Sequence, residues 1–177
     1  MLSPRIETDR LVLRRYIEND IDSIYDLITD KRLQTYIKYP KLTKDEELEN
    51  IRKWIENYDI DKKEKWVIVL KETNEVIGNI QINDINKKNN YCNIGYGIRY
   101  NYQGMGFATE AVTHISNYLL ESGYYLIEAS INELNIGSRR VLEKSGFIKD
   151  GYIANRRIND DGTYSAVEYY SKKERSE

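Results

Sequence analysis

The sequence predicts a layered α/β domain built around a mixed β-sheet. Strand-type and helix-type periodicities alternate along all 177 residues, and no repeat, linker or low-complexity tract interrupts them. The length is that of one domain, and 40% hydrophobic with 32% charged residues is typical of a globular unit with a substantial core. We therefore expect a single domain over residues 1–177, with a frayed tail at 171–177.

The first elements are a strand and an amphipathic helix. Alternating apolar residues predict a strand at about residues 6–16. Apolar residues at 21, 24, 25 and 28 then form one helical stripe, and Asn19 or Asp20 can cap that helix.

A second helix and a β-hairpin follow. Thr43 and Glu46 have the spacing of a capping box, so we expect a helix to begin there, with residues 44–49 on a solvated face. Two short apolar runs, 66–70 and 76–82, lie on either side of a turn-forming pair and predict a hairpin.

Glycines mark the next strand. Apolar side chains occupy one face of residues 92–98, and Gly95 and Gly97 occupy the other. Alternate glycines weaken a strand and indicate the close approach of a ligand or another backbone. An amphipathic helix from Ala108 should end near Gly123.

The C-terminal part should add a strand, a helix and two further strands. The strand is expected at 124–130, and the helix runs from Asn135 to a terminating Gly146. Two extended segments, 147–153 and 164–170, then flank a turn.

The composition excludes several kinds of chemistry and partner. With one cysteine and one histidine, the chain can form neither an internal disulfide nor a structural zinc site, and we expect Cys92 in the core and His114 on the surface. A net charge of -2 argues against a protein that binds nucleic acid, because such proteins normally carry an excess of basic residues. No apolar run approaches the ~20 residues of a membrane span, and the start has no signal-peptide core. We expect a cytoplasmic protein with no metal, no nucleic acid and no membrane partner.

Residues 103–111 carry the most specific signal. Gly104 and Gly106 lie between the glycine-marked strand and a helix, where backbone N–H groups and the helix dipole can bind an anion. We expect the loop to bind a phosphate or pyrophosphate; the alternative is that the loop only caps the helix. Neither glycine precedes lysine, which excludes a Walker A loop, and Thr109 replaces the third glycine of a dinucleotide fingerprint.

The same segment resembles the acetyl-CoA loop of the GNAT N-acetyltransferase superfamily. That loop has Gln or Arg, two residues, Gly, one residue, then Gly or Ala; here these are Gln103, Gly106 and Ala108. Three other stretches resemble more narrowly the ribosomal-protein N-terminal acetyltransferase branch (RimJ/RimL-like): 8–14, 109–111, and Asn135 with Ser138 and the later Gly146-Phe147. The resemblance covers about residues 6–170 in the right order.

The resemblance implies a fold and a cofactor site. The sheet would be mixed and mostly antiparallel, with helices on both faces and central strands splayed for CoA. Loop backbone would hold the CoA pyrophosphate at Gln103, Gly104, Met105, Gly106, Phe107, Ala108 and Thr109. The pantetheine arm would pair with the backbone of Tyr96, Gly97 and Ile98, while Asn135 and Ser138 line its path to the thiol.

Three residues are candidates for catalysis: Ser138, Asn93 and Asp84. Many GNAT enzymes use a tyrosine seven residues after the asparagine as the acid, and this chain has Leu142 there. Ser138 is therefore the expected hydrogen-bond donor to the CoA sulfur, unless it merely packs or caps its helix. Asn93 stands where the branch carries glutamate and can only position a water; Asp84 is the fallback base, with a solvent relay as the alternative.

The expected activity is direct transfer of an acetyl group from acetyl-CoA to a primary amine within a ternary complex. The amine would belong to a protein N-terminus or a small molecule, and the resemblance allows a homodimer through the C-terminal strands. A catalytically weak acyl-CoA-binding regulator and a structural or nucleotide-binding module are the alternatives. Arg139 and Arg140 would either meet the CoA 3′-phosphate or lie on a solvated helix face.

Overall fold

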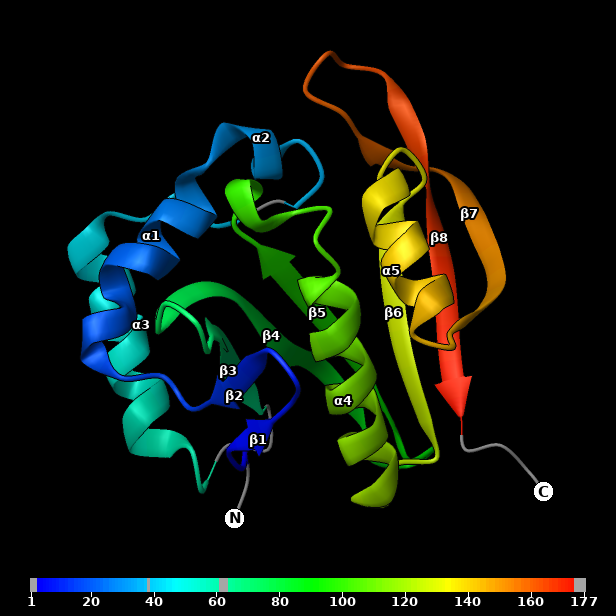
Figure 1. Ribbon diagram of the computed structural model, residues 1–177. Helices are drawn as coiled ribbons and strands as arrows, with labels where there is room; N and C mark the ends of the chain where they lie inside the picture. Colours follow the sequence, from blue (N-terminus) through cyan, green and yellow to red (C-terminus); the bar gives the residue numbers. More distant parts are fainter. Residues whose placement is uncertain (1–2, 38, 61–63, 174–177) are drawn as a thin grey trace.

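A single eight-stranded sheet organises the protein (Figure 1). The structure is a computed structural model, and it describes residues 3–37, 39–60 and 64–173. The strand order is β1-β2-β3-β4-β5-β6-β8-β7, and neighbouring strands are antiparallel except for the parallel pair β5 and β6. The predicted α/β fold with a mixed, mostly antiparallel sheet is confirmed.

The elements alternate along the chain as the periodicities predict. The strands are β1 Ile6–Glu7, β2 Leu11–Arg14, β3 Lys65–Leu70, β4 Glu75–Asn86, β5 Tyr91–Ile98, β6 Leu126–Asn132, β7 Ile148–Ile158 and β8 Tyr164–Lys173. The helices are α1 Ile21–Thr29, α2 Lys31–Gln34, α3 Lys44–Asn57, α4 Phe107–Glu121 and α5 Ile136–Lys144, with short 3-10 turns η1 Glu18–Asp20 and η2 Tyr100–Tyr102. No helix within these described ranges is long and apolar enough to cross a bilayer.

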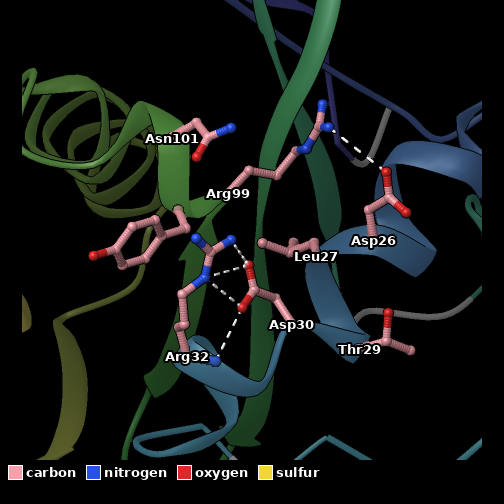
Figure 2. Close-up of a pocket in the computed structure, with 8 residues that line it drawn as sticks. Asp26, Leu27, Thr29, Asp30, Arg32, Arg99 and Asn101 are labelled. Atoms are coloured by element: carbon pink, nitrogen blue, oxygen red, sulfur yellow. Dashed lines mark hydrogen bonds and ion pairs between the residues drawn. The ribbon is translucent and has the colours of Figure 1, made fainter.

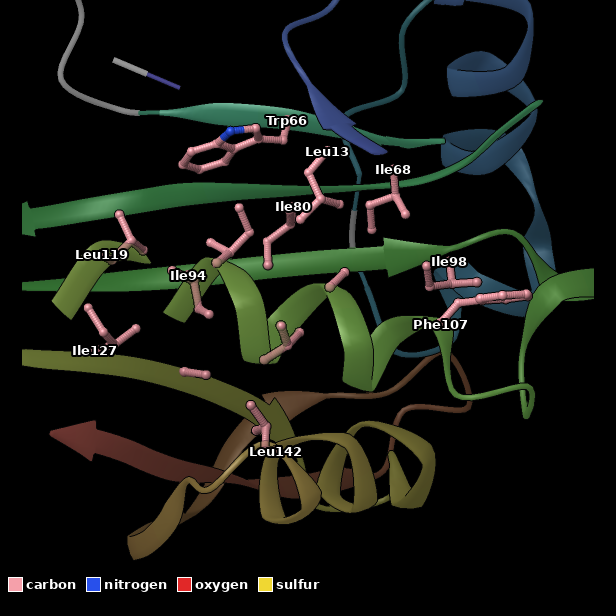
Figure 3. Close-up of a cluster of buried hydrophobic side chains, with 14 of the residues drawn as sticks. Leu13, Trp66, Ile68, Ile80, Ile94, Ile98, Phe107, Leu119, Ile127 and Leu142 are labelled. Carbon is pink, nitrogen blue, oxygen red and sulfur yellow. The ribbon is translucent and has the colours of Figure 1, made fainter. Parts of the chain in front are cut away.

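Helices cover both faces of the sheet. On one face, α4 packs on a core that includes Trp66, Ile80 and Ile94, all at most 2% exposed (Figure 3). On the other face, α1 and α3 pack on the opposite side chains of β2 and β3 through residues such as Ile24 and Ile51. Burying apolar area on both faces makes the strand backbones rigid, so they can hold side chains at fixed positions.

Two sequence expectations about the N-terminal half differ from the structure, and one short helix was not expected. The strand expected at 6–16 is wrong: Thr8 closes a turn, with its N–H 3.0 Å from the Leu11 carbonyl, and β1 folds back on β2. The capping box at Thr43 and Glu46 is confirmed, but the first turns of α3 are not wholly solvated, because Glu47 is only 5% exposed. The four-residue helix α2 has too few residues for a periodic signal.

The C-terminal strands extend further than expected. Strand β8 pairs with β6 as far as Lys173, opposite Leu126, so the expected frayed tail is wrong for residues 171–173. Residues 174–177 of that expectation lie outside the described part of the chain. Strand β7 flanks β8 as far as Ser171, and β6 pairs with Lys172 and Lys173 beyond it.

Strands β5 and β6 separate partway along their length. They pair only from Tyr91 to Asn93, opposite Leu126 to Glu128, and no further pairing between them is found in the described chain. The remainder of β5 and of β6 therefore presents two facing edges with unpaired backbone groups. The predicted splay is confirmed, and it opens the sheet between the two halves of the molecule.

Candidate functional site

The predicted pyrophosphate loop forms a sharp turn into helix α4. Gly104 and Gly106 have φ of +76° and +82°, a left-handed backbone that side chains with a Cβ rarely adopt. The first helical hydrogen bond runs from the Glu110 N–H to the Gly106 carbonyl at 3.0 Å. In the described chain, none of the N–H groups from residue 104 to residue 109 donates to a protein acceptor. These groups lie at the positive end of α4, so the loop can bind an anion.

A polar clamp holds this loop against the β1–β2 turn. The Glu110 carboxylate accepts hydrogen bonds from the Thr8 hydroxyl at 2.5 Å, the Arg10 N–H at 2.8 Å and Arg10 Nε at 2.7 Å. Arg10 also donates to the Met105 carbonyl at 2.9 Å and lies over the Phe107 ring. Burial opposes ionisation of Glu110, but these hydrogen bonds prevail and lower the pKa of its carboxyl. Sequence reasoning used 8–14 and 109–111 only as family signals and missed their contact.

The end of the splay beside α5 carries a hydroxyl pair. Asn135 caps α5, with its Oδ1 accepting from the Ser138 N–H at 3.0 Å. The Ser138 hydroxyl lies 2.6 Å from the Tyr96 hydroxyl, which also donates to the Ser138 carbonyl at 3.2 Å. Burial raises the pKa of Tyr96, so it remains a neutral donor. The sequence had placed only the Tyr96 backbone in the site, and nothing local signals the side-chain contact between residues 42 positions apart.

A cavity of about 390 Å³ occupies the splay next to this pair. Its lining comes from the segment after α2, from β4, β5, β6 and α5, and from β7. The lining residues are Tyr36, Ile37, Tyr39, Pro40, Asn79, Gln81, Asn83, Ile94, Gly95, Tyr96, Ala129, Ser130, Ile131, Asn132, Asn135, Ser138 and Arg157. No aspartate or glutamate is among these described residues. The predicted Tyr96, Asn135 and Ser138 therefore meet in one cavity, whereas Asp84 and Asn93 are not in its lining.

The two glycines of β5 make room for side chains from other elements. A Cβ on Gly97 would lie 2.6 Å from the Tyr39 hydroxyl, and one on Gly95 would lie 2.6 Å from the Asn83 amide nitrogen. Both neighbours line the cavity. Side chains, and not another backbone, thus come closest to these two glycines, and the close approach of a ligand stays a prediction.

Asn93 lies at the apex where the splay begins. In the sheet register it stands opposite Asp84 of β4 on one side and Glu128 of β6 on the other, and its Oδ1 accepts from Asn83 Nδ2 at 3.3 Å. Asp84 is exposed. Burial, with a smaller contribution from Asp150, raises the pKa of the half-buried Glu128. Sequence reasoning missed Glu128, because only the parallel pairing brings it beside Asn93.

Other singled-out residues have ordinary structural roles. Arg139 does not lie on a solvated face, because its guanidinium donates to Glu168 at 2.8 Å and to the Glu133 carbonyl at 3.0 Å. The neighbouring Arg140 is exposed. Cys92 is fully buried, and burial raises the pKa of its thiol to about 12. His114 is exposed on α4.

A second cavity, of about 300 Å³, lies between α1, α2 and η2 (Figure 2). Its charged side chains pair with one another: Arg99 lies 3.6 Å from Asp26, and Arg32 lies 2.5 Å from Asp30. None of the residues predicted for the site lines this cavity. The cavity in the splay is therefore the candidate active site.

Comparison with known proteins identifies the family. The acetyltransferase (GNAT) domain model matches residues 10–148. An uncharacterized N-acetyltransferase, p20 of Bacillus licheniformis, is 30% identical over 148 residues, which is 82% of this chain and 83% of that protein. Among solved structures, the ribosomal L7/L12 α-N-protein acetyltransferase RimL in complex with coenzyme A has a TM-score of 0.83 at 19% identity, covering 98% of each chain. Spermidine N-acetyltransferase from Vibrio cholerae, in complex with CoA and spermine, has a TM-score of 0.82 at 20% identity, covering 94% of this chain and 96% of that one. The family match over most of its length means that this chain belongs to the GNAT acetyltransferases.

Proposed function

We propose that the protein transfers the acetyl group of acetyl-CoA directly to a primary amine bound in the splay cavity. The observation that carries this proposal is the splay, where β5 and β6 lose their pairing beyond Asn93 and Tyr96, Asn135 and Ser138 line one cavity. The loop from Gln103 to Thr109 holds the pyrophosphate, and the backbone of Tyr96 to Ile98 pairs with the pantetheine arm. The solved structures of RimL and of the spermidine enzyme contain CoA, which supports this assignment.

The hydroxyl pair serves the leaving thiolate. The amine nitrogen attacks the thioester carbonyl, a C–N bond forms, the C–S bond breaks and the electron pair goes to sulfur. Ser138 donates to that sulfur. The Tyr96 hydroxyl, 2.6 Å away, then turns its single proton from the Ser138 carbonyl to the Ser138 hydroxyl oxygen, which completes a short relay. Asn135 holds the Ser138 backbone and so positions its hydroxyl.

The attacking amine must first lose a proton. An α-amine, with a pKa of ~7.7–8.0, requires less help than a lysine-type amine at ~10.4. Since no described residue of the lining is a carboxylate, the proton leaves through a water held near Asn93. Glu128 is better suited than Asp84 to receive it, because the pKa of Glu128 is raised while Asp84 is exposed. Asn93 and Glu128 lie side by side on adjacent strands. Their side chains are on the same face of the sheet as those of Asn83 and Ser130.

Ligand binding and turnover test the proposal together. We expect acetyl-CoA to raise the melting temperature of the protein, and ATP and NAD to leave it unchanged. Release of CoA thiol is then measured with a panel of amines that includes peptides with free α-amines. Stabilisation without thiol release would favour the catalytically weak regulator, and absence of any shift would reject both CoA-based functions.

The pH profile of the same assay tests the proton acceptor. Glu128→Gln should lower kcat/KM by roughly 100-fold and remove one ionisation from the profile. Asp84→Asn, the matched control on the other side of Asn93, should leave kcat/KM and its profile unchanged. The reverse result would assign the base to Asp84, and no change in either variant would assign proton removal to solvent.

A further inference from the structure

We infer that the acceptor is a small primary amine bearing an anionic group, a carboxylate or phosphate, which Arg157 binds. This inference rests on the proposed function and specifies its second substrate. It follows from the charge of the cavity and from the hydrogen-bonding state of one side chain.

The first observation concerns the charge of the lining. Arg157, on β7, is the only charged side chain among the described residues of the cavity; the polar ones are neutral amides and hydroxyls. An acceptor with several ammonium groups would find no carboxylate in this lining and would have to approach Arg157. An acceptor with one negative group would find its only complementary charge there.

The second observation concerns the Arg157 guanidinium itself. Its Nη1 donates to the Tyr36 carbonyl, but its Nη2 is buried and has no hydrogen-bond partner in the described structure. Burial is the main influence on the pKa of Arg157 and lowers it, with Asp160 acting in the opposite direction at longer range. A buried cationic donor without an acceptor is costly, whereas a carboxylate or phosphate oxygen would satisfy it with a charge-assisted hydrogen bond.

The contact with Tyr36 gives the arginine a fixed position. It joins β7 to the segment after α2, and both Tyr36 and Arg157 line the cavity. Ser138 and Tyr96, where the thioester would be, line the same cavity. A cavity of about 390 Å³ that must also admit the thioester end leaves room for a small molecule.

Matched acceptor pairs test the inference. Alanine is compared with alaninamide, and O-phosphoethanolamine with ethanolamine, with spermidine as the polycationic arm. Each kcat/KM is corrected for the neutral fraction of its amine. The wild type should prefer the anionic member of at least one pair by roughly 10- to 100-fold, mainly through a lower KM.

Arg157→Gln should remove that preference and Arg157→Lys should retain part of it. Arg156→Gln, at the exposed neighbouring position, should leave it unchanged.

The outcomes separate this inference from the proposed function. The acetyl-CoA melting shift of Arg157→Gln should equal that of the wild type, which shows that the fold and the CoA site are intact. Equal kcat/KM within both pairs, a preference for spermidine, or a preference that persists in Arg157→Gln would overturn the inference while thiol release continued. Failure of the proposed function differs, because then no amine would release thiol from acetyl-CoA.

Discussion

Ser138 shows how one residue acquires two separate roles. Its N–H belongs to the helix cap made by Asn135, and its hydroxyl belongs to the pair with Tyr96. The cap is local, so the sequence alone allowed it as one interpretation of Ser138. The hydroxyl contact joins α5 to β5 at the splay between β5 and β6, where both Ser138 and Tyr96 line the cavity.

Removing either hydroxyl should slow turnover without weakening acetyl-CoA binding. Ser138→Ala should lower kcat by roughly 100-fold, because the donor to the leaving sulfur is lost. Tyr96→Phe should lower kcat by about 10-fold, since Ser138 remains, and the double variant should be no slower than Ser138→Ala. Steady-state kinetics measures kcat, and calorimetry measures the Kd of acetyl-CoA. Ser122→Ala, at an exposed position outside the cavity, is the control, and an unchanged kcat in Ser138→Ala would exclude the assigned role.

At the scale of elements, the β1–β2 turn supports helix α4 and its loop. Arg10 bridges the Glu110 carboxylate and the Met105 carbonyl, so it connects the first turn of the helix to the loop before it. The segments 8–14 and 109–111, which resemble the family and lie about 100 residues apart in sequence, therefore both contribute to this clamp. The clamp therefore fixes the backbone of the loop that we propose as the pyrophosphate site.

Loosening this clamp should weaken acetyl-CoA binding specifically. Arg10→Ala should raise the Kd of acetyl-CoA by about 10-fold, because the loop must then be ordered on binding. The KM of the amine should stay unchanged, since Arg10 lies outside the cavity lining. Calorimetry measures the Kd, and thermal unfolding without ligand checks the fold. Arg5→Ala, whose ion pair with Glu7 is exposed, is the matched control; equal Kd values for both variants would contradict the role of the clamp.

At the scale of the whole molecule, buried Glu168 ties three elements together beyond the splay. This residue of β8 is 4% exposed and accepts from Arg139 of α5 at 2.8 Å and from Lys149 of β7 at 2.6 Å. The Tyr170 hydroxyl donates to it as well. Burial alone would raise the pKa of Glu168, but these three donors prevail and hold it below its ordinary value of 4.5.

The stabilisation by Glu168 should therefore be lost in acid. Because its pKa is lower in the folded than in the unfolded state, it stabilises the fold above the ordinary carboxyl pKa and ceases to do so as the pH falls through the folded value. Glu168→Gln should lower the free energy of unfolding by about 2 kcal/mol at neutral pH. This value is reduced from that of a fully buried ion pair, because Arg139 and Lys149 are partly exposed and solvent screens their charges. Urea unfolding at neutral and acidic pH measures this difference. An equal deficit at both pH values would contradict it, and Glu72→Gln, at an exposed position, serves as control.

The sequence by itself determined the features that depend on neighbours along the chain. The capping box at Thr43 is a reciprocal hydrogen bond between residues three apart, and the loop glycines need a left-handed backbone that few other residues tolerate. Helix stripes and strand alternation likewise depend on local periodicity. These signals were sufficient for the order of the elements apart from the turn between β1 and β2 and the short helix α2, and for the glycine loop before α4 and the buried position of Cys92.

Only the tertiary structure decided which distant side chains meet. The turn at Thr8, the clamp on Glu110, the Tyr96–Ser138 pair, Glu128 beside Asn93, and Arg157 in the cavity all depend on strand register and on where β5 and β6 separate. Pairing register is set by packing over the whole sheet. The sequence around any one of these residues therefore has no periodic pattern that would predict the contact. Local sequence thus determines the glycine loop before α4, while the splay brings together the residues on which the proposed chemistry and the proposed acceptor preference depend.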